Sequence, residues 1–277
     1  MAITLMYITN RPEVAIIAQE AGVDRIWIDL EVKGKEERQK GMNTVKSNHS
    51  IADIAKVKTV LNKSELMVRV NPLDDESEKE INRVISQGAQ YIMLPMYRTK
   101  DDVKRFLEYV DGRAKTILLL ETIEAAENID TYIDLKGIDE VHIGLNDLHL
   151  AYKRKFMFEL MADGTVDRLA KILNAREIRF GVGGLARIGH GVLPAEIILT
   201  QHYKLGSQMA ILSRSFCDAN IVENPQEIKS QFIEGVRNIR EFEKEIKNYT
   251  QLEYEKNFDE LQERIEQIVE SIRRKNL

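Results

Sequence analysis

Glu121 and Asp147 are the residues whose types and spacing point most directly to chemistry. Glu121 ends the apolar run 116–120, and Asp147 ends a second run, 141–146. Such runs are typical of parallel strands buried on both faces, and 124–135 between them carries apolar residues at helical spacing. Two carboxylates at the same end of neighbouring strands repel each other unless a cation lies between them. Because carboxylate oxygens suit Mg²⁺ or Mn²⁺, we predict a divalent-metal site held by this pair.

Arg69 is the third candidate residue. It lies in an apolar segment between Val68 and Val70, where a buried charge needs a partner. Beside a metal ion, a guanidinium would hold a substrate oxygen that becomes negative, and the set would stabilise an enolate. A structural ion pair with Asp29 or Glu31 is the alternative for Arg69.

The two carboxylates also have structural alternatives. A glutamate at a strand end is often a cap or an ion-pair partner, and Asn146-Asp147 before an apolar residue is a common helix N-cap. The paired glycines 183 and 184 can mark only a tight turn. It is the combination on adjacent strands that favours a metal site.

The composition limits the class of protein. The 277 residues are 43% hydrophobic and 31% charged, with a net charge of −5, so there is no basic footprint for nucleic acid or an anionic membrane. Cys217 is the only cysteine, which excludes an intramolecular disulfide and fits a reducing compartment. No signal peptide and no run of about 18 apolar residues is present. We therefore expect a cytoplasmic protein without a membrane span.

Eight apolar runs alternate with helical segments along residues 1–220. The expected strands are 3–8, 25–31, 66–71, 91–95, 116–121, 141–146, 179–185 and 208–212. This alternation in a chain of this length predicts a (β/α)8 TIM barrel. A doubly wound open sheet is disfavoured because no glycine-rich phosphate turn follows the first strand.

Residues 221–277 form a predicted helical extension. Residues 228–242 fit one amphipathic helix, and apolar residues from 254 to 272 then follow a heptad spacing. This seam needs a partner helix, either on its own barrel or on a neighbouring subunit. We favour the second alternative and expect a homo-oligomer.

With these residues in place, the chain resembles the HpcH/HpaI aldolase and citrate lyase β-subunit family of phosphoenolpyruvate/pyruvate barrels. The likeness extends from about residue 13 to residue 216. It rests on the segments Ile-Asp-Leu-Glu at 28–31, Val-Arg-Val-Asn at 68–71, 88–95, Leu-Leu-Glu-Thr at 119–122 with Glu124, and 143–148. Taken in order, these segments are much more specific than any one of them.

The resemblance implies a carbon–carbon lyase that acts on a small 2-oxo acid through a pyruvate-type enolate. It implies that Glu121 and Asp147 hold Mg²⁺ or Mn²⁺ and that Arg69 contacts the keto or enolate oxygen. Backbone amides of the loops after the fourth and sixth strands would seat the substrate carboxylate. The residues there are Pro95, Leu145 and Asn146.

The chain departs from the family pattern at the position of the usual base. Aldolase members carry a histidine directly after the Asp-x-Glu segment, where this chain has Val32. The polar stretch 33–50 is a candidate source of a replacement, and His49 is the first residue to consider as a catalytic base. Leu145 also stands where many members have proline or threonine.

Two other functions stay open. An acyl-CoA lyase of the citramalyl or malyl type would need a nucleotide-binding surface, for which the basic stretch 33–46 is a candidate. A non-catalytic barrel that kept the metal or anion site would instead act as a binding protein, with the C-terminal heptad helix as its interaction element.

Overall fold

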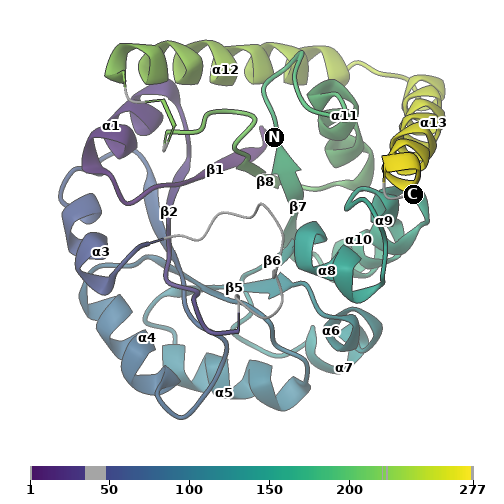
Figure 1. The fold of residues 1–277 in the computed structure, drawn as a ribbon. Helices are drawn as coiled ribbons and strands as arrows, with labels where there is room; N and C mark the ends of the chain where they lie inside the picture. Colours follow the sequence, from purple (N-terminus) through teal and green to yellow (C-terminus); the bar gives the residue numbers. More distant parts are fainter. Residues whose placement is uncertain (1, 35–47, 220, 223, 276–277) are drawn as a thin grey trace. The chain divides into compact units, whose positions relative to one another are not determined.

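The chain folds as a closed barrel of eight parallel strands (Figure 1). The computed structural model describes residues 2–34, 48–219, 221–222 and 224–275. The strands follow one another around the barrel in chain order, from β1 to β8. This confirms the predicted (β/α)8 barrel with additional C-terminal helices.

The element bounds agree closely with the sequence pattern. The strands are β1 (Thr4–Ile8), β2 (Arg25–Asp29), β3 (Glu65–Arg69), β4 (Tyr91–Leu94), β5 (Lys115–Leu120), β6 (Glu140–Ile143), β7 (Arg179–Leu185) and β8 (Met209–Leu212). The helices are α1 (Pro12–Ala21), α3 (Ile51–Lys58), α4 (Ser77–Ser86), α5 (Lys100–Val110), α6 (Ile123–Glu127), α7 (Ile129–Tyr132), α8 (Leu145–Ala151), α9 (Glu159–Ala162), α10 (Thr165–Ala175), α11 (Ala195–Leu205), α12 (Pro225–Ile246) and α13 (Gln251–Lys275).

Three expected elements are wrong in their bounds. The run 141–146 is not all strand, because β6 ends at Ile143 and α8 begins at Leu145 after Gly144 as N-cap. The expected helix 124–135 is two short helices that meet at Asn128. The expected helix 156–173 is split between α9 and α10, since Gly164 adopts a left-handed conformation with φ +86°.

The chain contacts divide the molecule into two compact units, which are described separately. The N-terminal unit is Met6–Val141, and the C-terminal unit joins Met1–Leu5 to His142–Leu277. Helices α12 and α13 thus share a unit with β7 and β8. No helix of the described residues is both long and apolar enough to cross a bilayer.

In the N-terminal unit, the register of β2 on β3 stacks like positions in layers. Arg25 lies opposite Glu65, Trp27 opposite Met67, and Asp29 opposite Arg69. Alternate residues of a strand share one face. This face therefore carries charged residues at both strand ends and an apolar layer between them, while both faces of β2 are buried.

The first residues of β2 and β6 form a buried ion pair. The Arg25 guanidinium donates to both carboxylate oxygens of Glu140, at 2.5 and 2.8 Å, and its Nε donates to Glu65 at 3.2 Å. The same guanidinium lies 3.8 Å from the Tyr91 ring centroid. Burial alone would lower the pKa of Arg25, but the hydrogen bonds and charge of Glu140 raise it above the usual value. Arg25 and Glu140 are only 1% and 4% exposed, so neither charge can rely on water.

In the C-terminal unit, α12 is tied to the start of the chain through Glu243. This buried carboxylate accepts the Ile3 backbone N–H at 2.7 Å, the Tyr203 hydroxyl at 2.8 Å and an Arg240 N–H at 2.8 Å. Asn224 caps the helix, and Pro225 occupies its first turn.

Helix α13 packs on α9 and α11 of its own chain (Figure 1). Its buried residues are Leu261, Ile265 and Val269, whereas Ile268 and Ile272 of the expected seam are only half-buried. Lys204 of α11 lies over the Phe258 ring, with Nζ 3.7 Å from the centroid. Of the two alternatives for this helix, the structure shows packing on its own chain; a neighbouring subunit stays a prediction.

Two histidines of this unit, His142 and His202, are completely buried. His202 Nδ1 shares a hydrogen bond with Ser207 Oγ at 2.8 Å, and its Nε2 has no hydrogen-bond partner among the described residues. Burial first, and the nearby His142 second, lower the pKa of His202 from 6.5 to about 3.

Replacing Arg25 by methionine is expected to destabilise the protein by about 3–5 kcal/mol, because the Glu140 carboxylate would stay buried without its guanidinium. Urea unfolding measures the change. The exposed pair Arg264–Glu260 on α13 gives a control, since Arg264→Met should cost less than about 1 kcal/mol. Equal effects of the two substitutions would contradict the structural role of Arg25.

Lowering the pH should destabilise the folded protein through His202. In the unfolded chain this imidazole binds a proton near pH 6.5, whereas the folded protein resists protonation down to about pH 3. The free energy of unfolding should therefore fall as the pH drops below about 6.5, by up to about 1.4 kcal/mol per pH unit from this group. Unfolding at pH 7 and pH 5 should show a smaller loss for His202→Gln; equal losses would refute the prediction.

Candidate active site

Arg69 lies at the end of β3, where two buried carboxylates hold it. Its Nε and Nη2 donate to the two oxygens of Asp29 at 2.8 and 2.9 Å, and its Nη1 lies 3.2 Å from Glu31 Oε2. The guanidinium also lies over the Trp27 ring, 5.0 Å from the centroid. The expected structural partners of Arg69 are thus its actual partners, and they fix the plane of the guanidinium.

A third carboxylate contributes to the same electrostatic environment. Burial alone would lower the pKa of Arg69, but the charges of Asp29, Glu31 and Glu121 raise it above the usual value. Asp29 and Glu31 are each 1% exposed, and Glu121 is 3% exposed. The Arg69 guanidinium therefore lies in the field of three buried carboxylates.

Glu121 follows β5 and is oriented by the chain after β4. The Met96 backbone N–H donates to Glu121 Oε1 at 3.1 Å. Met96 has φ +55°, a left-handed conformation that is uncommon for residues other than glycine. Pro95, the predicted substrate-binding residue of this loop, is buried directly before Met96.

Tyr97 is a neighbour of Glu121 that the sequence did not indicate. Its hydroxyl is 3.0 Å from the Tyr132 hydroxyl, and its carbonyl accepts the Thr122 hydroxyl at 2.7 Å. Burial, Tyr132 and the charge of Glu121 all raise the pKa of Tyr97. Only its position two residues after Pro95 could have pointed to it, because Tyr in an apolar segment is usually read as core.

His49 lies at the end of β2, although it is 20 residues from Asp29 in the sequence. The Asp29 backbone N–H donates to His49 Nδ1 at 3.0 Å. The next residue, Ser50, begins α3 in a capping box with Asp53, whose carboxylate also accepts Asn10 Nδ2 at 3.2 Å. These hydrogen bonds offset the effect of burial and lower the pKa of Asp53 to about 2. The structure therefore brings His49 next to the partner of Arg69.

The start of the connection after β2 is held by Asn71 and Glu80. Asn71 Oδ1 accepts the backbone N–H groups of Val32 and Lys33 at 3.0 and 3.1 Å, and its Nδ2 donates to Glu80 at 2.7 Å. The Val32 side chain is 58% exposed and supplies no proton-transfer group. Lys33 pairs with Asp74, and the rest of the predicted nucleotide-binding stretch, 35–46, lies outside the described residues.

The remaining predicted site residues belong to the C-terminal unit. Asp147 is the third residue of α8 and half-buried, rather than a residue at a strand end. Asn146 before it is exposed, whereas Leu145 is buried. The alternative that Asn146-Asp147 forms the helix N-cap is wrong, because Gly144 takes that place.

The donor chemistry fits a divalent cation. Mg²⁺ is commonly bound through one or two carboxylates, with water and substrate as its other ligands, and Glu121 is a buried carboxylate. No cluster of three or more His, Cys, Asp or Glu residues suited to a metal occurs in the described parts of the chain.

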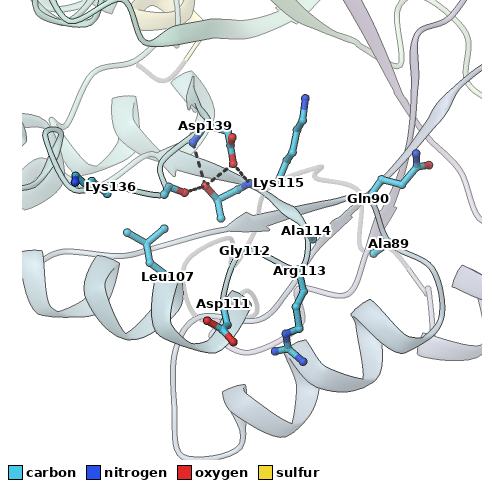
Figure 2. A pocket seen from close by; sticks show the side chains of 12 residues that line it. Ala89, Gln90, Leu107, Asp111, Gly112, Arg113, Ala114, Lys115, Lys136 and Asp139 are labelled. Carbon is cyan, nitrogen blue, oxygen red and sulfur yellow. Dashed lines mark hydrogen bonds between the residues drawn. The ribbon is translucent and has the colours of Figure 1, made fainter.

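A pocket at the opposite ends of β4 and β5 is separate from these residues (Figure 2). Its volume is about 650 Å³, and it is lined by Ala89, Gln90, Leu107, Asp111, Gly112, Arg113, Ala114, Lys115, Thr116, Lys136, Gly137 and Asp139. Asp139 accepts the Thr116 backbone N–H at 2.8 Å. In barrels of this class, chemistry gathers at the C-terminal strand ends, which is where Arg69 and Glu121 lie.

The neutral imidazole of His49 is expected to carry its proton on Nε2. A backbone N–H can only donate, so Nδ1 must act as the acceptor in the bond with Asp29. Long-range ¹H–¹⁵N NMR spectra of ¹⁵N-labelled protein report the tautomer, and His49→Gln identifies the signal. A neutral ring protonated on Nδ1 would contradict the observed hydrogen bond.

Comparison with known proteins agrees with this fold and with the family resemblance. The sequence profile of the HpcH/HpaI aldolase/citrate lyase family matches residues 3–161. No protein of curated function matches the sequence. The crystal structure of an HpcH/HpaI aldolase from Desulfitobacterium hafniense DCB-2 is similar at a TM-score of 0.58 and 15% identity, over 76% of this chain and 86% of that one, and this likeness concerns the fold alone. Because the profile match spans more than half of the sequence, the chain belongs to the HpcH/HpaI aldolase/citrate lyase family.

Proposed function

We propose that this protein is a divalent-metal-dependent carbon–carbon lyase of the aldolase type, acting on a small 2-oxo acid through a pyruvate-type enolate. Lyases characterise its family. The observation that supports the finer assignment is Arg69, held in a fixed plane by Asp29 and Glu31 within the field of Glu121. An arginine kept charged and oriented at a strand end suits a site that binds an anionic substrate.

In this proposal, Glu121 and Asp147 hold Mg²⁺ or Mn²⁺. The bound ion would supply Lewis-acid polarisation and charge compensation to the 2-oxo acid. The Met96 N–H fixes one oxygen of Glu121, so this carboxylate needs little reorganisation when it binds a cation. Asp147, in the first turn of α8, would contribute the second carboxylate.

Arg69 would hold the substrate oxygen that becomes negative. Its guanidinium is already oriented by two hydrogen bonds to Asp29, and a preorganised donor stabilises developing charge without first reorienting. Pro95, Leu145 and Asn146 would line the substrate, with backbone amides of their loops seating its carboxylate. Asn146 is the exposed member of this set.

The proton-transfer group is one place where the chain departs from the family resemblance, since Val32 stands where the usual histidine is expected. The Val32 side chain has no titratable group, and the Nδ1 of His49 already accepts a hydrogen bond from the Asp29 backbone N–H. We therefore assign His49 as a hydrogen-bond donor to an anionic substrate oxygen through Nε2, rather than as the base. Because no general base is assigned, a non-catalytic barrel that binds a small anion stays as the second candidate function. The acyl-CoA lyase alternative has less support, because the described Lys33 is engaged by Asp74.

Titration of Mn²⁺ into metal-free protein, with and without oxalate as a planar enolate mimic, tests the proposal. Oxalate should bind only when Mn²⁺ is present. Glu121→Gln and Asp147→Asn should each weaken Mn²⁺ binding at least ~100-fold while the fold is retained, because outer-sphere changes alone commonly cost 10–100-fold. Asp139→Asn, in the pocket at the opposite strand ends, is the matched control and should leave Mn²⁺ affinity unchanged.

Exchange of the pyruvate methyl protons with solvent separates the enzyme from the binding protein. Metal-dependent exchange, followed by NMR in D₂O, requires enolisation and would support a lyase. Binding of Mn²⁺ and oxalate without exchange would favour the non-catalytic barrel. Absence of both metal and oxalate binding would overturn the lyase assignment.

A further inference from the structure

We propose that His142 is a positioning residue for Asp147, acting through the glycines of β7 on the first turn of α8. The inference rests on the proposed metal-binding role of Asp147. All residues involved belong to the C-terminal unit. It also assigns a structural role to the paired glycines 183 and 184, which otherwise mark only the end of β7.

His142 is joined to the end of β7 by a hydrogen bond. The imidazole is 0% exposed, and its Nε2 lies 3.1 Å from the Gly183 carbonyl oxygen. A carbonyl oxygen can only accept, so Nε2 carries the proton and donates it. This bond fixes the direction of the Gly183–Gly184 peptide.

Gly181 allows the ring of His142 to lie directly against β7. A Cβ at this position would be 2.5 Å from His142 Nδ1 and 2.7 Å from the Met209 carbonyl oxygen. No side chain fits there. The pairing of β7 with β8 also shifts register between Gly181 and Gly184, so the strand is irregular where His142 holds it.

Gly183 in turn leaves room for the side chain of Leu145. It has φ +51°, and a Cβ on it would be 2.8 Å from Leu145 Cδ1. Leu145 is the first residue of α8 and only 1% exposed. Asp147 lies two residues further in the same helical turn, so a displacement of Leu145 relative to Gly183 also moves the Asp147 carboxylate.

The contacts form one continuous chain from a buried ring to a predicted metal ligand. His142 fixes the Gly183 peptide, Gly183 leaves room for Leu145, and Leu145 places the first turn of α8. Substitution of a residue that orients a metal ligand commonly lowers metal affinity by 10–100-fold. His142 is therefore expected to influence metal binding without contacting the metal.

Mn²⁺ affinity of the full-length protein, measured by calorimetry, tests this role. A glutamine amide reaches about as far as imidazole Nε2 and can donate to the Gly183 carbonyl, whereas an asparagine amide is too short. His142→Asn should weaken Mn²⁺ binding about 10-fold, and His142→Gln should restore it to within ~3-fold of the unaltered protein. His202→Gln is the matched control, because His202 is equally buried nearby but hydrogen-bonds to Ser207; it should leave Mn²⁺ affinity unchanged.

A second pair of variants keeps the test independent of the folding of His142→Asn. Gly183→Ala adds a Cβ where the Leu145 side chain lies. Gly164→Ala adds one at another glycine with positive φ, where no atom lies within 4 Å. Weaker Mn²⁺ binding by Gly183→Ala alone would support the proposal, and equal affinities would overturn it.

Two further results would count against it. Unchanged Mn²⁺ affinity in a folded His142→Asn protein would overturn the positioning role, as would equal losses in His142→Asn, His142→Gln and His202→Gln, which would indicate a general effect on stability. Failure of the unaltered protein to bind Mn²⁺ would instead overturn the proposed function, and this inference with it.

Discussion

The guanidinium of Arg69, paired with two buried carboxylates, is the constraint on which the candidate site depends. Its charge can lie at the end of β3 only because Asp29 is directly opposite in the register of β2. A shift of that register by one residue would turn the two side chains to opposite faces of the sheet. The ion pair therefore ties the alignment of two strands to the chemistry at their ends.

The same strand pair carries a second guanidinium at its other end. Arg25 pairs with Glu140, and an apolar layer around Trp27 and Met67 separates the two charged layers. Burial of an ion pair contributes little net stability, but loss of one partner is costly. The Arg25 pair thus specifies how strands meet, whereas the Arg69 pair lies where barrel enzymes place their reactive groups.

Membership of the HpcH/HpaI aldolase/citrate lyase family limits the reaction class and leaves the proton transfer open. The family's usual histidine position holds Val32, which Asn71 anchors through its backbone. His49 returns to the end of β2 but offers its Nδ1 to the Asp29 peptide. The family resemblance thus covers the proposed metal-and-arginine part of the site, and it does not extend to Val32.

The sequence by itself determined the barrel, because alternating apolar runs and helical periods are local patterns that a reader can recognise. It also singled out Glu121, Asp147 and Arg69 as candidate site residues, since a charge beside a buried strand is conspicuous in the sequence. It could not place Asp147 on a helix, because the end of β6 depends on Gly144 and on the contact of Leu145 with Gly183.

Only the tertiary structure decided which partners these residues have. Arg25 and Glu140 are 115 residues apart, and His142 and Gly183 are 41 apart. Neither pairing follows from local periodicity, because strand register and barrel closure bring these groups together. The tautomer of His49 was decided in the same way, by a backbone N–H 20 residues away. Local sequence sets which elements form, and long-range hydrogen bonding between them sets what their side chains can do.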